Sequence, residues 1–286
     1  MERLIKQELL RLKSLGWIDR SVVIDGINVL RVTDPTLISF PENLHQPINL
    51  TKKSIWEKWR SYGLQELIET EKIDLIWEIG AGSGAMALQL KEFGISTIGV
   101  EPLISGVKSL NLCGIYSYCG TLEDLKLPSN SLRAVGLFDV IEHLNNPFLL
   151  LKEVHRVLKP GGVLITSVPA CQFLFSHYDL SIGHFRRYSK KELQKQFDDV
   201  GFEKHRIKYQ QIFLTIPVFI SRTIRYKLGI DICGSRLANK NINQKIFLNK
   251  FSKVIEIIMK IESKFELPFG FSLISISKKP SQFKNS

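Results

Sequence analysis

The chain has 286 residues, of which 44% are hydrophobic and 23% charged, a composition typical of a folded protein. This length suits one sizeable α/β domain with additions, or two small domains. The four cysteines (Cys113, Cys119, Cys171 and Cys233) form no CxxC pair and no His/Cys cluster. We therefore expect neither a disulfide framework nor a metal site, and reduced thiols in a cytoplasmic protein.

The positive charge is concentrated in the last quarter of the chain. The formal net charge is +11, and residues 221–286 hold 13 Lys/Arg against 4 Asp/Glu. Such a segment is typical of contact with nucleic acid, an anionic membrane surface or a phosphorylated substrate, and also of a plain solvated surface. The N-terminus lacks the apolar run of a signal peptide, and no run reaches the roughly 18 apolar residues of a membrane span. Peripheral contact with the inner membrane surface stays open.

Residues 1–70 predict an N-terminal extension without assigned chemistry. An amphipathic helix over residues 1–20 is followed by short β-prone runs in residues 21–50, with Asp-Gly and Asp-Pro turn signals. These runs predict a small hairpin element. Residues 54–70 predict a further helix, which carries Trp56 and Trp59.

Residues 71–210 predict an α/β core. Strand-like runs rich in Ile, Val and Leu alternate there with helical segments, a pattern typical of βαβ units in a doubly wound, mostly parallel sheet. Residues 211–268 predict a helical insertion, with one apolar helix face from Phe247 to Phe265. Residues 269–286 predict a last strand and a basic tail.

A glycine-rich turn follows the first strand of this core. Gly80, Gly82 and Gly84 separate the run IWEI from a helical segment. Such a turn presents free backbone N–H groups at the carboxyl ends of the strands, and its glycines let a ligand approach the backbone closely. Glu78 lies just before the turn, and Glu101 ends the next strand about 20 residues on, where a carboxylate can accept both hydroxyls of a ribose. A second interpretation makes Glu101 a helix N-terminal carboxylate.

The spacing of the glycines discriminates between nucleoside ligands. A dinucleotide fingerprint reads GxGxxG, whereas this turn reads GxGxG and holds no basic residue to neutralise a pyrophosphate. The pattern disfavours NAD and favours a nucleoside without a charged linker, such as S-adenosylmethionine.

The order EIGAGSG, VEP, TLEDLKLPSNS, LFDVIEHLNNP and LKEVHRVLKPGGVLITSVP resembles the class I S-adenosylmethionine-dependent methyltransferase superfamily over residues 73–170. The resemblance implies a seven-stranded, Rossmann-like methyltransferase fold. It implies that Glu101 binds the ribose hydroxyls and that the methionine part is held by Glu78 and the turn Gly80, Ala81, Gly82, Ser83 and Gly84. It also places Leu122, Glu123 and Asp124 beside the adenine, and Leu137, Phe138 and Asp139 near the methionine end and the acceptor. Arg133 departs from the aspartate that many relatives have before this strand.

A narrower resemblance covers later segments. HYDLSIGHFRRYSKKEL and ELPFGFSLISISKKP are similar to bacterial methyltransferases associated with glycosyltransferase and surface-polysaccharide functions. This resemblance does not specify an acceptor.

Three histidines are candidates for removing a proton from a hydroxyl acceptor. His143 follows the fourth strand of the core, and His177 and His184 follow the fifth, at the edge where such sheets bind substrates. For His143 a structural role as an oriented, hydrogen-bonded residue is slightly favoured over base catalysis. Four further residues are candidates for substrate binding: Asp179, Arg186, Arg187 and Tyr188. Forked arginine donors suit a phosphate or carboxylate, while the alternative is a helix-entry loop with Ser189 as the helix cap.

The sequence favours O-methylation of a small-molecule, glycan or lipid-linked acceptor, covered by the helical insertion. An RNA methyltransferase is an alternative, although no RNA-binding module or stacking platform is apparent and nucleic acid is not the expected partner. A non-catalytic S-adenosylmethionine-binding partner protein and an NAD-dependent dehydrogenase are further alternatives. The oligomeric state is not predicted.

Overall fold

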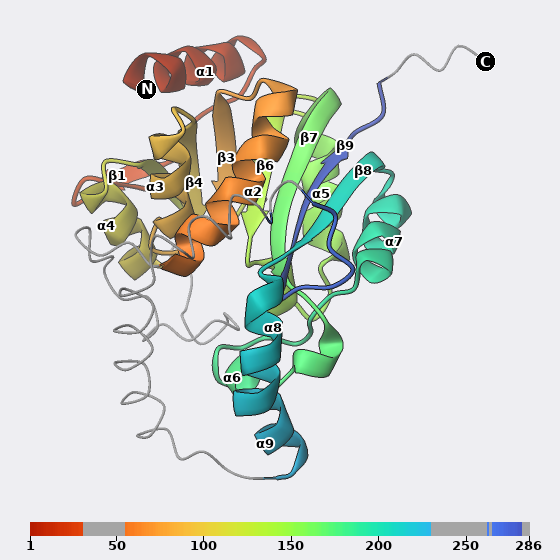
Figure 1. The fold of residues 1–286 in the computed structure, drawn as a ribbon. Coiled ribbons are helices and arrows are strands. Elements are labelled where there is room, and N and C mark those ends of the chain that lie inside the picture. The colour runs from red at the N-terminus through yellow and green to blue at the C-terminus, as the bar shows by residue number, and fades with distance from the viewer. Residues whose placement is uncertain (31–54, 230–261, 263–264, 282–286) are drawn as a thin grey trace.

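The computed structural model describes residues 1–30, 55–229, 262 and 265–281, and these form one mixed sheet with helices on both faces (Figure 1). The strands are β1 (Val22–Ile24), β2 (Ile27–Val29), β3 (Leu75–Ile79), β4 (Ser96–Glu101), β5 (Tyr116–Cys119), β6 (Leu132–Phe138), β7 (Leu158–Pro169), β8 (Glu203–Gln210) and β9 (Ser272–Lys278). The longer helices are α1 (Glu2–Ser14), α2 (Ile55–Glu71), α3 (Ala85–Glu92), α4 (Ile104–Leu112), α5 (Phe148–Val157) and α7 (Lys190–Val200). The shorter helical segments are η3 (Ile141–His143), η4 (Gln172–Leu174), α6 (His177–Ser181), α8 (Ile212–Val218), η5 (Phe219–Thr223) and α9 (Ile224–Lys227).

The strands lie in the order β1-β2-β5-β4-β3-β6-β7-β9-β8. Strands β2 to β7 pair in parallel, whereas β9 runs antiparallel between β7 and β8. The predicted doubly wound sheet is confirmed. Its strand count is corrected from seven to nine, because the predicted N-terminal hairpin β1–β2 does not stand alone but joins the sheet at the edge of β5.

Two apolar layers hold the helices to the sheet. On one face, side chains of α1, α5 and α7 pack in the largest buried cluster, where the Trp77 ring stacks on that of Tyr118 at 6.3 Å. On the other face, α2 and α3 pack against Ile76, Ile165 and Ile274 of three strands. Burial on both faces explains why these strands read as continuous apolar runs in the sequence.

The insertion after β8 is helical where it is described. Elements α8, η5 and α9 follow one another below the sheet in Figure 1, together with α6. The predicted apolar helix face from Phe247 lies, up to Ile261, outside the described residues. In the part of the chain that the structure describes, no helix combines the length and apolar character needed to cross a bilayer.

Candidate functional site

The turn between β3 and α3 has the backbone conformation that its glycines predict. Gly80, Gly82 and Gly84 all have positive φ angles, of 71°, 55° and 90°. A Cβ atom added at Gly80 would lie 2.7 Å from the Val140 side chain, which follows β6. The turn and the end of β6 are therefore in direct contact, and a side chain on Gly80 would separate them.

Glu101 is bound to this turn through its carboxylate. Its Oε2 accepts the N–H of Gly82 at 2.8 Å, and its Oε1 accepts the N–H of Leu103 at 2.9 Å. Burial raises the pKa of Glu101 to about 7, although these two hydrogen bonds act in the opposite direction. An ionised carboxylate offers about four lone-pair sites, so both oxygens can still accept a hydroxyl. The helix-terminus interpretation is partly correct, because Leu103 directly precedes α4.

Glu78 lies fully buried beside Glu101. Burial and the nearby Glu101 carboxylate raise its pKa to about 8. Its Oε2 atom makes no hydrogen bond to any residue that the structure describes. A buried acceptor of this kind suits a ligand that brings a positive charge or an N–H donor, as the amino acid end of S-adenosylmethionine does.

The remaining cofactor candidates lie after β5, at the end of β6 and within the glycine turn. Asp124 accepts hydrogen bonds from the backbone and hydroxyl of Thr121, so it closes the turn after β5, while Leu122 is buried and Glu123 is exposed. Leu137 and Phe138 are buried at the end of β6. Ala81 and Ser83 lie within the glycine turn itself. Arg133 points to the other end of the sheet, where it donates to the carbonyl of Glu71 at 3.4 Å.

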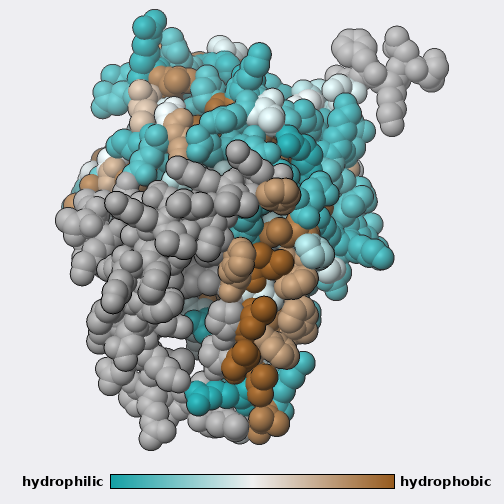
Figure 2. All heavy atoms as spheres, viewed as in Figure 1, coloured by the Kyte–Doolittle hydropathy of each residue, from teal (hydrophilic) through white to brown (hydrophobic). Residues whose placement is uncertain are grey.

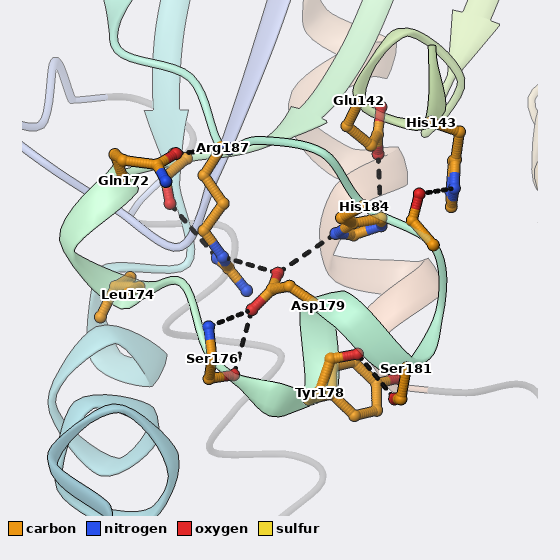
Figure 3. Close-up of polar contacts among 12 residues, drawn as sticks. Glu142, His143, Gln172, Leu174, Ser176, Tyr178, Asp179, Ser181, His184 and Arg187 are labelled. Carbon is orange, nitrogen blue, oxygen red and sulfur yellow. Dashed lines mark hydrogen bonds and ion pairs between the residues drawn. The ribbon is translucent and has the colours of Figure 1, made fainter. Parts of the chain in front are cut away.

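A second group of polar side chains lies where the segments after β6 and β7 meet (Figure 3). Its centre is the Asp179 carboxylate, which accepts the Nε–H of Arg187 at 2.8 Å and contacts Nδ1 of His184 at 3.1 Å. Ser176 donates to the same carboxylate through its backbone N–H and its hydroxyl. Burial alone would raise the pKa of Asp179, but the hydrogen bond from His184 and the charge of Arg187 outweigh it and lower the pKa.

His184 and His143 are brought together by this arrangement. Their rings pack edge to face with centroids 4.6 Å apart, and Nδ1 of His143 lies 3.2 Å from the carbonyl oxygen of Gly183. Glu142 is fully buried, and its Oε1 lies 3.9 Å from Nε2 of His184. Glu142 was not among the residues predicted from the sequence, and its position directly before His143 becomes informative only once the loop that carries His184 is placed beside it.

The structure places the other predicted acceptor-side residues differently. His177 is exposed and packs its ring against Tyr226 of α9, with centroids 4.7 Å apart. Arg186 donates to the carbonyls of Leu144 and Asn145, which ties the two loops together. Tyr188 is buried, which raises its pKa, and its hydroxyl donates to the Ile141 carbonyl.

Arg187 and Ser189 connect the cluster to α7. The Arg187 guanidinium is buried against Asp179 and the Ala170 carbonyl, so it positions the loop rather than facing solvent. Ser189 caps α7 by accepting the N–H of Glu192, as the alternative interpretation of this segment predicts. Whether any of these side chains contacts an acceptor stays a prediction.

Part of the α/β core matches a known protein family. Residues 77–166 match the family described as a methyltransferase domain. A mitochondrial ubiquinone biosynthesis O-methyltransferase of Rattus norvegicus is 30% identical over 111 residues, 35% of this chain and 32% of that protein. An uncharacterised methyltransferase of Mycobacterium leprae is 24% identical over 139 residues, 44% of this chain and 51% of that protein. The matches thus span about a third to a half of these relatives' lengths.

A solved structure shares the fold. The S-adenosylmethionine-dependent methyltransferase from Thermotoga maritima has a TM-score of 0.51 at 20% identity, covering 78% of this chain and 90% of that one. Residues 77–166 therefore match a methyltransferase domain, and the sheet that contains them has the Rossmann-like fold of this solved structure. The glycine turn, Glu78 and Glu101 all lie inside or at the start of the matched segment.

Proposed function

We propose that the protein transfers a methyl group from S-adenosylmethionine to a hydroxyl oxygen of a small-molecule, glycan or lipid-linked acceptor. The observation that carries the proposal is the pairing of Glu101 with the glycine turn beside the buried Glu78 carboxylate. Together they offer hydroxyl acceptors at the end of β4 and, at the end of β3, a buried carboxyl group that a cationic ligand would favour in its ionised form. These groups suit a ribose and a cationic amino acid end.

The residues of the chain perform three tasks in this reaction. Glu101 orients the ribose, and Glu78 and the turn Gly80–Gly84 orient the amino acid end. Bound S-adenosylmethionine supplies a methyl group made electrophilic by its sulfonium. The cluster Glu142, His143 and His184 then faces the acceptor, because Val140, two residues before Glu142, contacts Gly80 of the turn. Holding the two reactants in line supplies much of the acceleration in such displacements.

An exposed apolar stripe supports an amphiphilic acceptor. Figure 2 shows hydrophobic side chains gathered along α8 to α9, and the exposed members Phe213, Ile216, Ile220, Ile224 and Leu228 recur at helical spacing. Arg225 and Lys227 of α9 add positive charge beside them. A lipid-linked substrate at an anionic membrane surface combines both properties.

Vesicle co-sedimentation tests this part of the proposal. The protein should pellet with vesicles that contain anionic lipid, and Ile216→Asp with Ile220→Asp should remain in the supernatant. Leu112→Asp on α4 is the matched control, because Leu112 is more exposed than either isoleucine but does not belong to the stripe. Equal binding by all three proteins would exclude the stripe as the contact surface.

The central experiment is calorimetric titration with S-adenosylhomocysteine. The wild type should bind it, and Glu101→Ala should weaken binding by about 10- to 100-fold, the equivalent of losing hydrogen bonds to a charged group. Asp199→Ala is the control, because Asp199 is exposed on α7 and is not among the cofactor-binding candidates. Binding of NAD in place of S-adenosylhomocysteine would contradict the proposal. Binding without turnover on hydroxyl acceptors would favour a non-catalytic partner, and strongly salt-dependent RNA binding would favour an RNA substrate.

A further inference from the structure

Three potential metal ligands converge at the carboxyl ends of β6 and β7. Glu142, His143 and His184 each offer one ligand atom, and these atoms lie within 4.8 Å of one another. The 3.9 Å separation of Glu142 Oε1 and His184 Nε2 is longer than a hydrogen bond. Two coordination bonds of about 2.1 Å to a common ion span up to about 4.2 Å, so one ion reaches both of these atoms, and any ligand pair further apart must close by a few tenths of an ångström when the ion binds.

Both imidazoles are already oriented as metal ligands usually are. A histidine ligand generally donates its second ring N–H to a carboxylate or a backbone carbonyl, which fixes the tautomer. His143 meets the Gly183 carbonyl through Nδ1, and His184 meets the Asp179 carboxylate through Nδ1. A carbonyl oxygen and an ionised carboxylate can only accept, so in the neutral rings both protons lie on Nδ1 and both Nε2 atoms keep a lone pair.

The carboxylate that orients His184 is itself firmly held. Arg187 and Ser176 both donate to Asp179, and these hydrogen bonds hold its carboxylate in place (Figure 3). This gives the carboxylate–histidine arrangement found behind many metal ligands. The Glu142 side chain is 0% exposed, and a cation beside it would offset the cost of burying its charge. His143 and His184 keep 8% and 9% of their surface exposed, so an ion bound there remains accessible to a substrate.

We propose that Glu142, His143 and His184 bind a divalent transition-metal ion, with an open coordination position for the acceptor hydroxyl. Two imidazoles and a carboxylate suit zinc, iron, cobalt or manganese. The inference rests on the proposed methyltransferase function, and it places a metal ion where the acceptor hydroxyl is proposed to bind. It replaces the sequence-based expectation of no metal, and makes His143 and His184 ligands instead of proton acceptors.

The ion would activate the acceptor hydroxyl by lowering its pKa. The hydroxyl proton passes to solvent, and the oxygen forms a bond to the methyl carbon. The bond between that carbon and the sulfonium sulfur breaks, and its electron pair stays on sulfur. The products are a methyl ether and the neutral thioether S-adenosylhomocysteine, so atoms and charge balance without any oxidant or reductant.

Titration of chelator-treated full-length protein with CoCl2, followed by visible absorption, tests the site. We expect one equivalent of Co²⁺ to produce the d–d bands of a histidine-ligated ion, and ZnCl2 to displace it. Glu142→Gln and His184→Ala should lose these bands. Asp179→Asn should keep them while weakening affinity by about 10- to 100-fold, the effect of removing a residue that only orients a ligand. His177→Ala should bind Co²⁺ as the wild type does, because His177 packs on Tyr226 instead.

S-adenosylhomocysteine binding by the same variants separates the two proposals. A Glu142→Gln variant that loses Co²⁺ but still binds S-adenosylhomocysteine is folded, and it supports the metal site. Unchanged Co²⁺ bands in Glu142→Gln and His184→Ala, or no stoichiometric Co²⁺ binding by the wild type, would overturn the metal site alone. Intact Co²⁺ binding without S-adenosylhomocysteine binding would instead contradict the methyltransferase function.

Discussion

Arg187 donates its Nε–H to the Asp179 carboxylate at 2.8 Å, and the two side chains are only 2% and 0% exposed. Buried ion pairs gain little net stability over apolar packing, but removing one partner leaves the other charge uncompensated in a medium of low dielectric constant. This pair also orients His184. The ion pair therefore links the stability of the segment after β7 to the geometry of the acceptor side.

Asp179→Asn should lower the free energy of unfolding by about 3–5 kcal/mol, because it leaves the Arg187 guanidinium buried without a counter-charge. Urea denaturation at pH 7 measures the change. The matched control is Asp198→Asn, which removes a carboxylate that is 53% exposed and paired with His205, and should cost less than about 1 kcal/mol. Equal losses in the two variants would show that burial does not set the strength of the Asp179 pair.

Gly106→Ala should weaken S-adenosylhomocysteine binding without touching any proposed ligand contact. A Cβ at position 106 would lie 2.7 Å from Cγ of Glu101 and 2.8 Å from the Gly82 carbonyl, so the carboxylate or the turn must move. Such overpacking costs about 1–3 kcal/mol. Lys108→Ala, two residues on and exposed, should leave affinity unchanged in the same calorimetric titration. Wild-type affinity in Gly106→Ala would mean that the position of Glu101 does not matter for binding.

The two buried carboxylates should make the ligand-free protein less stable as the pH rises. The pKa values of Glu78 and Glu101 are raised from 4.5 to about 8 and about 7, so the folded state binds protons that the unfolded state has already released. Their contribution is fully present below about pH 4.5 and is lost as the pH rises through these folded-state values. Glu78→Gln should therefore flatten the fall in unfolding free energy between pH 5 and pH 8, measured by urea denaturation. A slope equal to that of the wild type would show that Glu78 ionises freely when buried.

The proximity of Glu78, Glu101 and the glycine turn could be predicted from the sequence because it depends on local order. The glycine turn, Glu78 and Glu101 lie within about 24 residues, on two adjacent parallel strands whose carboxyl ends meet at one edge. Spacing along the chain is then enough to predict proximity. The pairing of Glu101 with the N–H of Gly82 could not be predicted, because it depends on the side-chain conformation of Glu101 and on the space that Gly106 leaves beside it.

The cluster of Glu142, His143 and His184 depends on contacts between distant segments. His143 and His184 are 41 positions apart and meet because the backbone of Phe185 bonds to the Glu142 carbonyl and Arg186 to those of Leu144 and Asn145. His177, seven positions before His184, had an equally suitable residue type, yet α6 turns it toward Tyr226. Residue type alone therefore could not distinguish the role of His177 from that of His184. Glu142 was missed because a carboxylate next to a histidine is uninformative until the loop that carries His184 is placed beside it.

The position of β9 has a consequence for how the protein folds during synthesis. β9 lies between β7 and β8. The carbonyl of Phe271, the residue directly before β9, accepts the N–H of Ala170, and its ring packs against the Arg187 guanidinium. Strand β8 pairs with β9 on its inner side, so it waits for residues 272–278 to leave the ribosome before it can join the sheet. Contacts of such long sequence separation form late. A nascent chain that ends before residue 271 therefore lacks both the partner strand of β8 and the Phe271 ring that packs on the Arg187 guanidinium.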